Sequence, residues 1–308
     1  LMTSIVTLTV NPSIEKSSSV DTVASEIKLR CDPPQFHPGG GGINVSRAIN
    51  KLDGESTAIF TAGGGAGQML NHLLNAENIQ TQPIPISGLT RENLIVYENS
   101  TSLQFRFGMP GPDITEWKRC IEATLEHDAD YIVASGSLAP AMPDNFYEIL
   151  ANRVKETDSK LIVDTSGVAL EACKHSEVFL LKPNLYELEL LSGKKFQSED
   201  ALVDIVREMI ADGMAEVFVI SMGAAGAMMI SADEAVKMRP PVVPIQSKVG
   251  AGDSMVGGIV WSLANGDDLT TAVRYGISAG SAAVMTEGTE LCRANDVHDI
   301  FNRIAVVD

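Results

Sequence analysis

The sequence predicts an α/β fold in which a mostly parallel sheet is covered by helices on both faces. Short apolar runs rich in β-branched residues, typical of buried strands, alternate along the chain with segments of helical periodicity. The alternation is most regular from residue 117 to residue 221. Strands that are joined in this way by helices run parallel and are buried on both faces of the sheet.

The individual elements follow from these patterns. The first part of the chain gives strands at 4–10 and 56–63, a helix from Asn44, a glycine-rich turn at 63–67 and a helix at 68–76. The regular part gives strands at 130–135, 160–164, 177–182 and 216–221, and helices at 117–128, 144–157, 184–191 and 199–212. A further long helix ends at Gly266. No shift in composition marks a boundary, so residues 1–308 are expected to form one domain.

Two segments interrupt the alternation. Residues 14–37 are polar, with a short alternating stretch at 26–31 that predicts a strand. Residues 89–107 predict a β-hairpin whose turn lies at 99–101. The two segments could pair into a small sheet beside the main one, or each could be a decoration of its edge, and the sequence leaves both arrangements open.

Composition excludes several classes of function. The chain has 308 residues and a net charge of −17, which disfavours binding to nucleic acid or to an anionic membrane. Its 4 cysteines lie far apart and form no zinc or disulfide motif, as expected in a reducing compartment. With no signal peptide and no apolar run that could span a bilayer, the protein is expected in the cytoplasm.

A run of four glycines, residues 39–42, directly precedes the segment of helical periodicity that begins at Asn44. A helix N-terminus offers free N–H groups and a partial positive charge, and glycine lets a ligand approach the backbone closely. The alternatives are a flexible linker and a turn that serves tight packing. Because the run leads straight into a helix, we favour a loop that binds a ligand.

The strongest candidate for chemistry is G-A-G-D at 250–253, which opens a long apolar helix. Gly250, Ala251 and Gly252 would direct several backbone N–H groups at one point, where an anion can bind. Asp253 places a carboxylate beside that point, which suits a base that deprotonates a hydroxyl as it attacks a phosphate. The alternative is an acidic residue that merely interacts with the helix dipole.

The segment 181–191 offers a second group of polar residues. Lys182 ends a strand, at the edge where open α/β sheets bind ligands. Asn184 and Glu187 could face a Mg²⁺ ion through water. The same N-x-x-E spacing is also a helix capping box, which the local sequence favours, and both roles can coexist.

Basic residues are concentrated on the two interrupting segments. Lys28 and Arg30 are two apart in the stretch 26–31, and Arg91 and Arg106 belong to the hairpin. Such a group could bind an anionic substrate such as a sugar phosphate, although each residue alone could be ordinary surface charge. G-x-S-x-G and P-loop motifs are absent, which argues against an α/β-hydrolase and a P-loop enzyme.

Together these motifs resemble the PfkB family of ribokinase-like sugar kinases over about residues 5–304. The shared stretches are TLTVNPSIE, KLRC, PGGGGINVSRAI, SGSL, VDTSG, KPNLYELE, VISMGAAGAM and VGAGDSMVGG. G-A-G-D with an upstream G-G-x-x-N-V is highly specific for the family. KLRC, GGGGIN and RFGMPG at 106–111 resemble its phosphofructokinase-2 branch.

The resemblance implies a three-layer α/β/α sandwich with a small β-sheet lid, formed by about 14–37 and 89–107, that often forms a dimer interface. It implies transfer of a phosphoryl group from ATP with Mg²⁺ to a sugar hydroxyl, here the C1 hydroxyl of fructose-6-phosphate. Asp253 would be the base, and Gly250, Ala251 and Gly252 the anion hole. The implied contacts to sugar and substrate phosphate are Glu15, Lys28, Arg30, Gly39, Gly40, Asn44, Arg91, Arg106 and Ser137.

On the nucleotide side, the implied contacts are Lys182, Asn184, Ser221, Gly223, Gly226, Gly280 and Ala283. Asn184 and Glu187 would hold Mg²⁺ through water. The same resemblance implies a monovalent cation, K⁺, at Ser247, Val249 and Gly288.

Three departures from the family pattern concern the sugar. Glu15 stands where the family has Asp, SGSLAPAM replaces S-G-S-L-P-P-G, and GGGAG lacks the usual acidic residue. Tagatose-6-phosphate kinase and 1-phosphofructokinase are therefore alternatives to 6-phosphofructokinase. A kinase of unphosphorylated sugars or nucleosides is disfavoured by the basic residues, and a non-catalytic sugar-phosphate sensor by Asp253.

Overall fold

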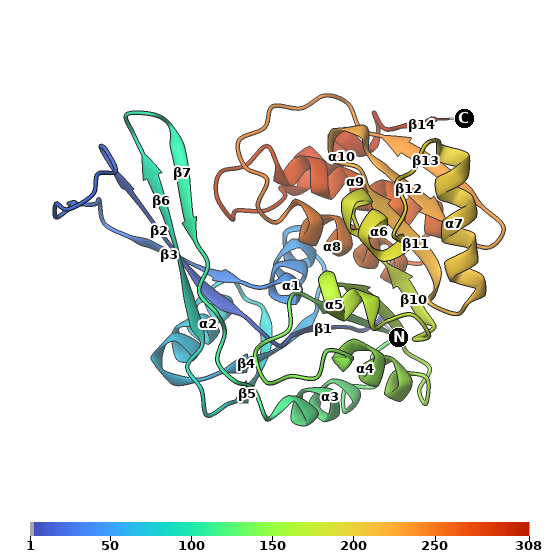
Figure 1. The fold of residues 1–308 in the computed structure, drawn as a ribbon, viewed down its shortest axis with the longest axis horizontal. Helices are drawn as coiled ribbons and strands as arrows, with labels where there is room; N and C mark the ends of the chain where they lie inside the picture. Colours follow the sequence, from blue (N-terminus) through green and yellow to red (C-terminus); the bar gives the residue numbers. More distant parts are fainter. Residues whose placement is uncertain (1–2, 308) are drawn as a thin grey trace.

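The computed structural model describes residues 3–307 and contains a ten-stranded sheet with the order β14-β13-β12-β11-β10-β9-β8-β1-β4-β5 (Figure 1). Its strands are β1 (Ile5–Thr9), β4 (Thr57–Ala62), β5 (Gln80–Pro85), β8 (Tyr131–Ser135), β9 (Lys160–Asp164), β10 (Val178–Leu181), β11 (Ala215–Ser221), β12 (Ala227–Ile230), β13 (Ala235–Arg239) and β14 (Ala305–Val307). The strands from β5 to β11 in this order are parallel, and the three beyond β11 are antiparallel.

Helices cover both faces of this sheet, so the predicted three-layer sandwich is confirmed (Figure 1). One apolar core contains residues of α3 (Trp117–Leu125), α4 (Phe146–Val154), α5 (Gly167–Glu171), α6 (Leu185–Ser192) and α7 (Glu199–Ala211). The core on the other face contains residues of α1 (Gly41–Lys51), α8 (Ala251–Ala264), α9 (Leu269–Ala283) and α10 (Ala294–Phe301). The helix α2 (Gly64–Ala76) packs beside α1 in a third, smaller core.

Two helices begin earlier than the sequence predicts. The helix expected from Asn44 begins at Gly41, and the one expected from 68 begins at Gly64. Gly41 and Gly42 therefore lie in the first turn of α1, and the glycines from Gly64 onward lie in the first turn of α2. Glycine is a poor helix former, but the first turn of a helix is set by how the chain leaves the preceding strand rather than by propensity.

A second, four-stranded sheet stands apart from the first (Figure 1), with the order β3-β2-β6-β7. Its strands are β2 (Ser13–Val20), β3 (Gln35–Gly39), β6 (Arg91–Glu98) and β7 (Leu103–Phe107). The two interrupting segments thus pair with each other, and the hairpin is confirmed. We call this sheet the lid.

The strand predicted at 26–31 is wrong. These residues belong to the loop between β2 and β3, in which Ile27 is 66% exposed. Alternation predicts a strand only where one face has a surface to pack against, and this loop has none in the described chain. It extends from the far tip of the lid, away from α8 (Figure 1).

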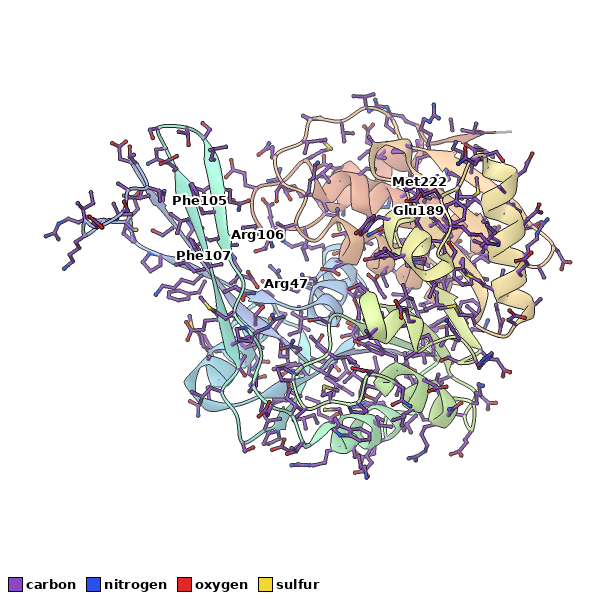
Figure 2. All side chains as sticks on the ribbon, in the orientation of Figure 1. Arg47, Phe105, Arg106, Phe107, Glu189 and Met222 are labelled. Carbon is purple, nitrogen blue, oxygen red and sulfur yellow. The ribbon has the colours of Figure 1, made fainter. Side chains whose placement is uncertain are left out.

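The register of the lid strands separates two faces. Glu15 pairs with Asn93 and with His37, and Ser13 pairs with Arg91, so these side chains share one face. Arg106, opposite Ile95, belongs to the same face. The other face carries aromatic and aliphatic side chains, and Figure 2 shows Phe105 and Phe107 on the opposite side of β7 from Arg106. The outer apolar face consists of Phe36, Leu94, Val96, Leu103, Phe105 and Phe107.

The polar face of the lid is turned toward the α/β sandwich. It borders a cavity of about 390 Å³ whose opposite wall is the segment 287–290, which follows α9. The lid and the sandwich thus form the two sides of a cleft. Within residues 3–307, no helix is long and apolar enough to cross a membrane.

Candidate active site

The candidate residues gather where the parallel strands end. Asp164 is the last residue of β9, Lys182 follows β10, and Ser221 is the last residue of β11. The N-terminus of α8 lies beside these strand ends, because Gly252 packs against the end of Lys182. Side chains distant in the sequence therefore meet at the carboxyl edge of the sheet, the usual ligand-binding edge of open α/β folds.

Gly250 determines how α8 begins. It is the N-cap residue in the left-handed conformation, with φ 73°. A β-carbon on Gly250 would lie 2.3 Å from Cδ2 of Leu291, so a side chain there would be strained by its conformation and would require Leu291 to move. The backbone N–H groups that follow, those of Ala251, Gly252 and Asp253, have no acceptor within the helix. The start of α8 is therefore a free helix N-terminus, which the predicted anion hole requires.

Asp253 lies in the first turn of α8 and is partly exposed to the cleft. Its Oδ2 accepts a hydrogen bond from Nδ2 of Asn44 at 2.9 Å. The pKa of Asp253 is raised to about 7, chiefly by burial and then by the negative charge of Asp164, while the Asn44 hydrogen bond and the charge of Lys182 act to lower it. A carboxyl group that titrates near neutral pH suits a general base.

Lys182 forms a buried ion pair beside this helix N-terminus. Its Nζ lies 3.2 Å from Oδ1 of Asp164, and its side chain is 6% exposed. Burial alone would lower the pKa of Lys182, but the charge of Asp164 and the hydrogen bond to it, with smaller effects of Asp253 and Glu187, outweigh burial and raise it. The ammonium group is therefore held charged next to the place where an anion would bind.

The four glycines of 39–42 are all in close contact with protein atoms. A β-carbon on Gly41 would lie 2.3 Å from Oγ of Ser135, and one on Gly42 would lie 2.6 Å from the carbonyl oxygen of Leu8. Gly40 has φ 126°, which side chains rarely adopt. Tight packing between α1 and the strand ends thus accounts for glycine here, whether or not a ligand also contacts this backbone.

Glu15 lies against the beginning of the glycine run. Its Oε1 accepts hydrogen bonds from Oγ of Ser13 at 2.6 Å and from Nδ2 of Asn93 at 2.8 Å. A β-carbon on Gly39 would lie 2.7 Å from the same oxygen. The side chain of Glu15, which is longer than the Asp of the family pattern, is therefore held in one position by two donors. Its second carboxylate oxygen takes no part in these bonds. Asn93, which the sequence analysis did not single out, positions this carboxylate.

Arg91 and Ser137 line a cavity of about 560 Å³ near the base of the lid, with Asn11 between them. Arg91 donates to the carbonyl oxygens of Asn11 at 3.0 Å and Met109 at 3.2 Å, and Asn11 donates to Oγ of Ser137 at 3.3 Å. Two buried polar atoms, Nε of Arg91 and Oδ1 of Asn11, have no hydrogen-bond partner among the described residues. Burial lowers the pKa of Arg91, and the charge of Glu15 opposes this.

The four predicted cations are only partly brought together. Arg91 and Arg106 share the polar face of the lid, on adjacent strands. Lys28 and Arg30 are exposed in the loop between β2 and β3, at the tip of the lid. Within one chain, Lys28 and Arg30 therefore do not join Arg91 around a single anion.

Asn184 and Glu187 form the predicted capping box at the start of α6. Oδ1 of Asn184 accepts from the backbone N–H of Glu187 at 2.8 Å, and Oε2 of Glu187 accepts from the backbone N–H of Asn184 at 2.9 Å. Asn184 also forms an isolated parallel bridge with Ser221, which places these two residues together at the edge of the sheet. Oε1 of Glu187 takes no part in the cap.

The residues described by the structure hold no cluster of three or more His, Cys, Asp or Glu side chains suited to a metal ion. A Mg²⁺ ion that is bound mostly by phosphate oxygens and water needs only one or two carboxylates and no such cluster. Oε1 of Glu187 is the kind of ligand that this arrangement requires.

Among the glycines expected near the nucleotide, only Gly223 is exposed, in the short 3-10 turn η1 (Gly223–Ala225). Gly226 is buried against β13, where a β-carbon would lie 2.0 Å from the carbonyl oxygen of Met238. Gly280 and Ala283 are buried in the packing of α9. These three positions contact protein rather than the cleft, so the visible reason for their small size is packing.

The residues proposed to surround a monovalent cation come from two loops that meet. Oγ of Ser247 donates to the carbonyl oxygen of Gly288 at 3.0 Å, and the backbone N–H of Val249 donates to the same hydroxyl at 3.2 Å. The structure thus brings Ser247, Val249 and Gly288 into one small polar group.

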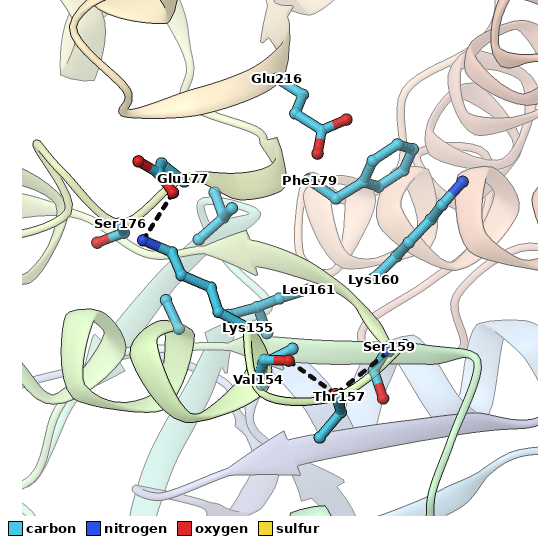
Figure 3. A pocket seen from close by; sticks show the side chains of 12 residues that line it. Val154, Lys155, Thr157, Ser159, Lys160, Leu161, Ser176, Glu177, Phe179 and Glu216 are labelled. Atoms are coloured by element: carbon cyan, nitrogen blue, oxygen red, sulfur yellow. Dashed lines mark hydrogen bonds and ion pairs between the residues drawn. The ribbon is translucent and has the colours of Figure 1, made fainter.

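A cavity at the opposite edge of the sheet is unrelated to this site (Figure 3). It has a volume of about 170 Å³ and lies where β9, β10 and β11 begin. Three of its charged groups already have partners, since Lys155 forms an ion pair with Glu177 at 2.9 Å and Nζ of Lys160 lies 4.7 Å from the ring centroid of Phe179.

This geometry agrees with what comparison with known proteins gives. The sequence matches the model of the pfkB family carbohydrate kinases over residues 5–296. The chain belongs to the pfkB family of carbohydrate kinases. It is 39% identical to the ATP-dependent 6-phosphofructokinase isozyme 2 of Escherichia coli, over 97% of this chain and 98% of that one. It is also 33% identical to a 1-phosphofructokinase of Borreliella burgdorferi, over 99% and 98% of the two chains.

The fold of this pfkB chain also matches a solved structure. A crystal structure of the phosphofructokinase-2 from Escherichia coli in complex with potassium matches it with a TM-score of 0.93, at 38% identity, over 98% of this chain and 99% of that chain. The ribokinase-like α/β fold and a sugar-phosphate kinase activity are therefore established for this pfkB chain.

Proposed function

We propose that the protein is an ATP-dependent 6-phosphofructokinase that phosphorylates the C1 hydroxyl of fructose-6-phosphate. The observation that carries the proposal is the pairing of Asp253, with a pKa of about 7, with the free N-terminus of α8 directly beside it. A base and an anion-binding site at one point are what in-line transfer of a phosphoryl group requires.

In this mechanism, Asp253 accepts the proton of the attacking hydroxyl, and Asn44 holds the carboxylate toward the cleft through the 2.9 Å hydrogen bond. The backbone N–H groups of Ala251 and Gly252 stabilise the charge that develops on the transferring phosphoryl group. Lys182 adds a fixed positive charge, because its ion pair with Asp164 keeps it protonated although it is buried.

The sugar is held between the glycine run and the lid. Glu15, fixed by Ser13 and Asn93, accepts hydrogen bonds from sugar hydroxyls near Gly39 and Gly40. The substrate phosphate binds at Arg91 and Ser137, which line the same cavity, and Arg106 on the same face of the lid adds charge.

ATP lies along the ends of β10 and β11, near Asn184, Ser221 and Gly223. A Mg²⁺ ion that neutralises its phosphates would be contacted by Glu187, and by Asn184 through water, because the capping box leaves one Glu187 oxygen unused. The loops that carry Ser247, Val249 and Gly288 would hold a K⁺ ion through backbone carbonyl and hydroxyl oxygens.

The outer apolar face of the lid supports a homodimer. Leu103 is 57% exposed and Phe107 is 48% exposed on a sheet whose other face is polar. Large side chains gathered on one exposed face mark an interaction surface, and a second copy with the same face would cover it.

Turnover of a panel of sugars tests the substrate. Release of ADP from ATP and Mg²⁺ is measured with fructose-6-phosphate, tagatose-6-phosphate, fructose-1-phosphate, fructose and ribose. The proposal predicts the highest kcat/KM with fructose-6-phosphate. A preference for fructose-1-phosphate, the substrate class suggested by the 33% identical relative, would reject it in favour of a 1-phosphofructokinase.

A further inference from the structure

Arg47 is a buried arginine that the proposed mechanism does not use. It lies on α1, one helical turn after Asn44, and its side chain is 4% exposed. Arginine is rarely buried to this extent unless its guanidinium group has hydrogen-bond or ion-pair partners. The hydrogen-bond partners of Arg47 therefore indicate its role.

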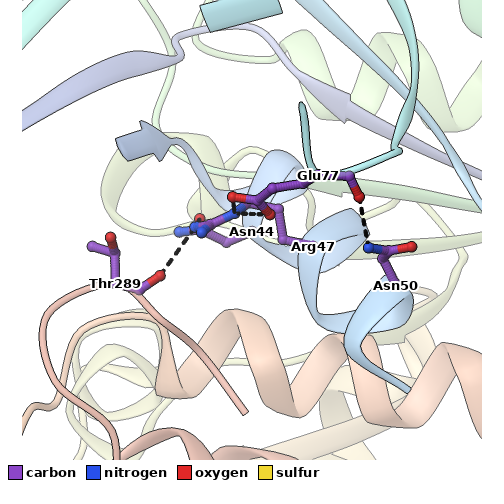
Figure 4. A network of polar contacts seen from close by, with 5 residues as sticks. All are labelled: Asn44, Arg47, Asn50, Glu77 and Thr289. Carbon is purple, nitrogen blue, oxygen red and sulfur yellow. Dashed lines mark hydrogen bonds and ion pairs between the residues drawn. The ribbon is translucent and has the colours of Figure 1, made fainter. Parts of the chain in front are cut away.

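The guanidinium group has partners in two directions (Figure 4). On one side, Nε donates to both carboxylate oxygens of Glu77, at 2.8 and 3.0 Å, which ties α1 to the end of α2. On the other side, Nη1 donates to Oδ1 of Asn44 at 3.4 Å and to the carbonyl oxygen of Thr289 at 3.1 Å. An arginine that only joined α1 to α2 would not need the second set of contacts.

We infer that Arg47 is a positioning residue that fixes the orientation of the Asn44 amide, and through it the carboxylate of Asp253. This inference rests on the proposed function, because it assigns Arg47 a part in holding the proposed base.

The reason lies in the direction of each hydrogen bond. A guanidinium group can only donate, and an ionised carboxylate can only accept. The Asn44 amide has one accepting end and one donating end, and it lies between the two. Oδ1 therefore faces Arg47 and Nδ2 faces Asp253. The reversed amide would place its NH₂ group against Arg47 and its oxygen against the carboxylate, so both contacts would become repulsive.

The contact with Thr289 extends the same group to the other side of the anion hole. Thr289 belongs to the segment that carries Leu291, whose Cδ2 lies where a side chain of Gly250 would be. Arg47 thus joins the helix that carries Asn44 to the segment that packs against the start of α8. One guanidinium group therefore contacts both the residue that hydrogen-bonds the proposed base, Asn44, and the segment that packs against the N-terminus of α8.

The groups around Asp253 indicate in which direction its pKa should change when Arg47 is replaced. Asp164 from β9 raises the pKa of Asp253, and Lys182, which follows β10, lowers it, as does the hydrogen bond from Asn44 on α1. Glu187 on α6 faces Lys182. When Arg47 is removed, the Asn44 amide is free to rotate and the carboxylate loses its donor part of the time. The pKa of Asp253 should then rise further.

The experiment is a double-mutant cycle between Arg47→Met and Asn44→Ala, with kcat for fructose-6-phosphate measured at saturating ATP. Arg47→Met is expected to lower kcat by about tenfold or more, part of the roughly 10²- to 10⁴-fold that general base catalysis contributes, with the KM for ATP within about twofold. If Arg47 acts through Asn44, Arg47→Met costs almost nothing further in the Asn44→Ala background. Equal losses in both backgrounds would overturn the inference.

Two further variants separate positioning from stability. Glu77→Gln removes the ion pair but leaves both contacts of Nη1, so its kcat should stay within about twofold of wild type, given that neutral partners still hydrogen-bond the guanidinium. A loss as large as that of Arg47→Met would assign Arg47 a purely structural role. If Arg47→Met alone does not fold, the neutral pair Arg47→Met/Glu77→Met replaces it in the cycle, because no unpaired charge is then left buried.

A readout without turnover keeps the inference distinct from the proposed function. The Asp253 carboxyl carbon is followed by ¹³C NMR titration in the ligand-free enzyme, with its signal assigned from Asp253→Asn. Arg47→Met should raise the midpoint above that of wild type, and Glu77→Gln should leave it in place. An unchanged midpoint in folded Arg47→Met would refute the inference, whereas absence of turnover in wild type would refute only the proposed function.

Discussion

Replacing Asp253 by Asn should make the protein more stable while it removes activity. The carboxylate is partly buried, lies near Asp164 and has a pKa of about 7, against an ordinary value of 3.8. Each pKa unit corresponds to 1.36 kcal/mol, so the ionised form is disfavoured in the folded state by at most about 4 kcal/mol, an upper limit because the side chain is partly exposed to water. An Asn side chain removes this cost and can still accept the hydrogen bond from Asn44.

The sign of the effect depends on pH. A folded-state pKa raised above the unfolded value means that the folded protein binds the proton more tightly, so ionisation of Asp253 destabilises it as pH rises. The cost is absent below about pH 4 and complete above about pH 7. The gain from Asp253→Asn should therefore be near zero at pH 4 and reach at most about 4 kcal/mol at pH 8.

Urea denaturation of wild type and Asp253→Asn at several pH values measures this gain. Asp130→Asn is a matched control, because hydrogen bonds from the backbone and side chain of Ser4 hold the pKa of Asp130 below its usual value. That substitution should destabilise the protein above the pKa, with the opposite sign. If Asp253→Asn were no more stable than wild type at pH 8, the reasoning about the buried carboxylate would be refuted.

Three other predictions follow from the same geometry. The wild-type kcat/KM should rise with pH through about 7 as Asp253 ionises. In wild type the hydrogen bond from Asn44 lowers the pKa of Asp253, so Asn44→Ala should raise this pKa and move the rise in kcat/KM to higher pH. A pH–rate profile that does not move would count against Asp253 as the base. Arg91→Met should raise the KM for fructose-6-phosphate by about tenfold or more, the loss expected of a charge-assisted hydrogen bond to phosphate, and should leave the KM for ATP unchanged. Steady-state kinetics with each substrate varied measures both constants. An equal rise in both would mean that the substrate phosphate binds elsewhere. Phe107→Asp should yield monomers, because a charge on the outer apolar face of the lid opposes burial, and a dimer of unchanged mass in light scattering would exclude that interface.

The sequence predicted the main sheet well because its central strands are buried on both faces. Runs such as 130–135 and 160–164 are nearly continuous apolar stretches, and each matches an observed strand to within one residue. The strands toward the two edges of the sheet were not predicted: β5 at one edge, and the antiparallel β12 and β13 with the short β14 at the other. Their pairing depends on an edge that only the assembled sheet provides, and most residues of β13 and β14 are at least partly exposed.

The candidate site divides in the same way. Local motifs sufficed for the helix N-terminus at Gly250 and for the capping box at Asn184, because both depend on neighbours in the chain. The sequence could not show that Lys28 lies at the tip of the lid, away from Arg91. Its alternating pattern predicted a strand, but the segment forms an exposed loop because no other surface of the described chain packs against it. Asn93 and Arg47 have no local motif, and only the fold brings them to Glu15 and Asn44.

The central claim is that Asp253 is the base in phosphorylation of fructose-6-phosphate. The most direct test is the rate of ADP release by Asp253→Asn at saturating ATP, Mg²⁺ and fructose-6-phosphate, together with the binding of both substrates. The account predicts that kcat falls by about 10²- to 10⁴-fold while binding of each substrate changes by only a few fold. A folded Asp253→Asn enzyme with a kcat near that of wild type would contradict it.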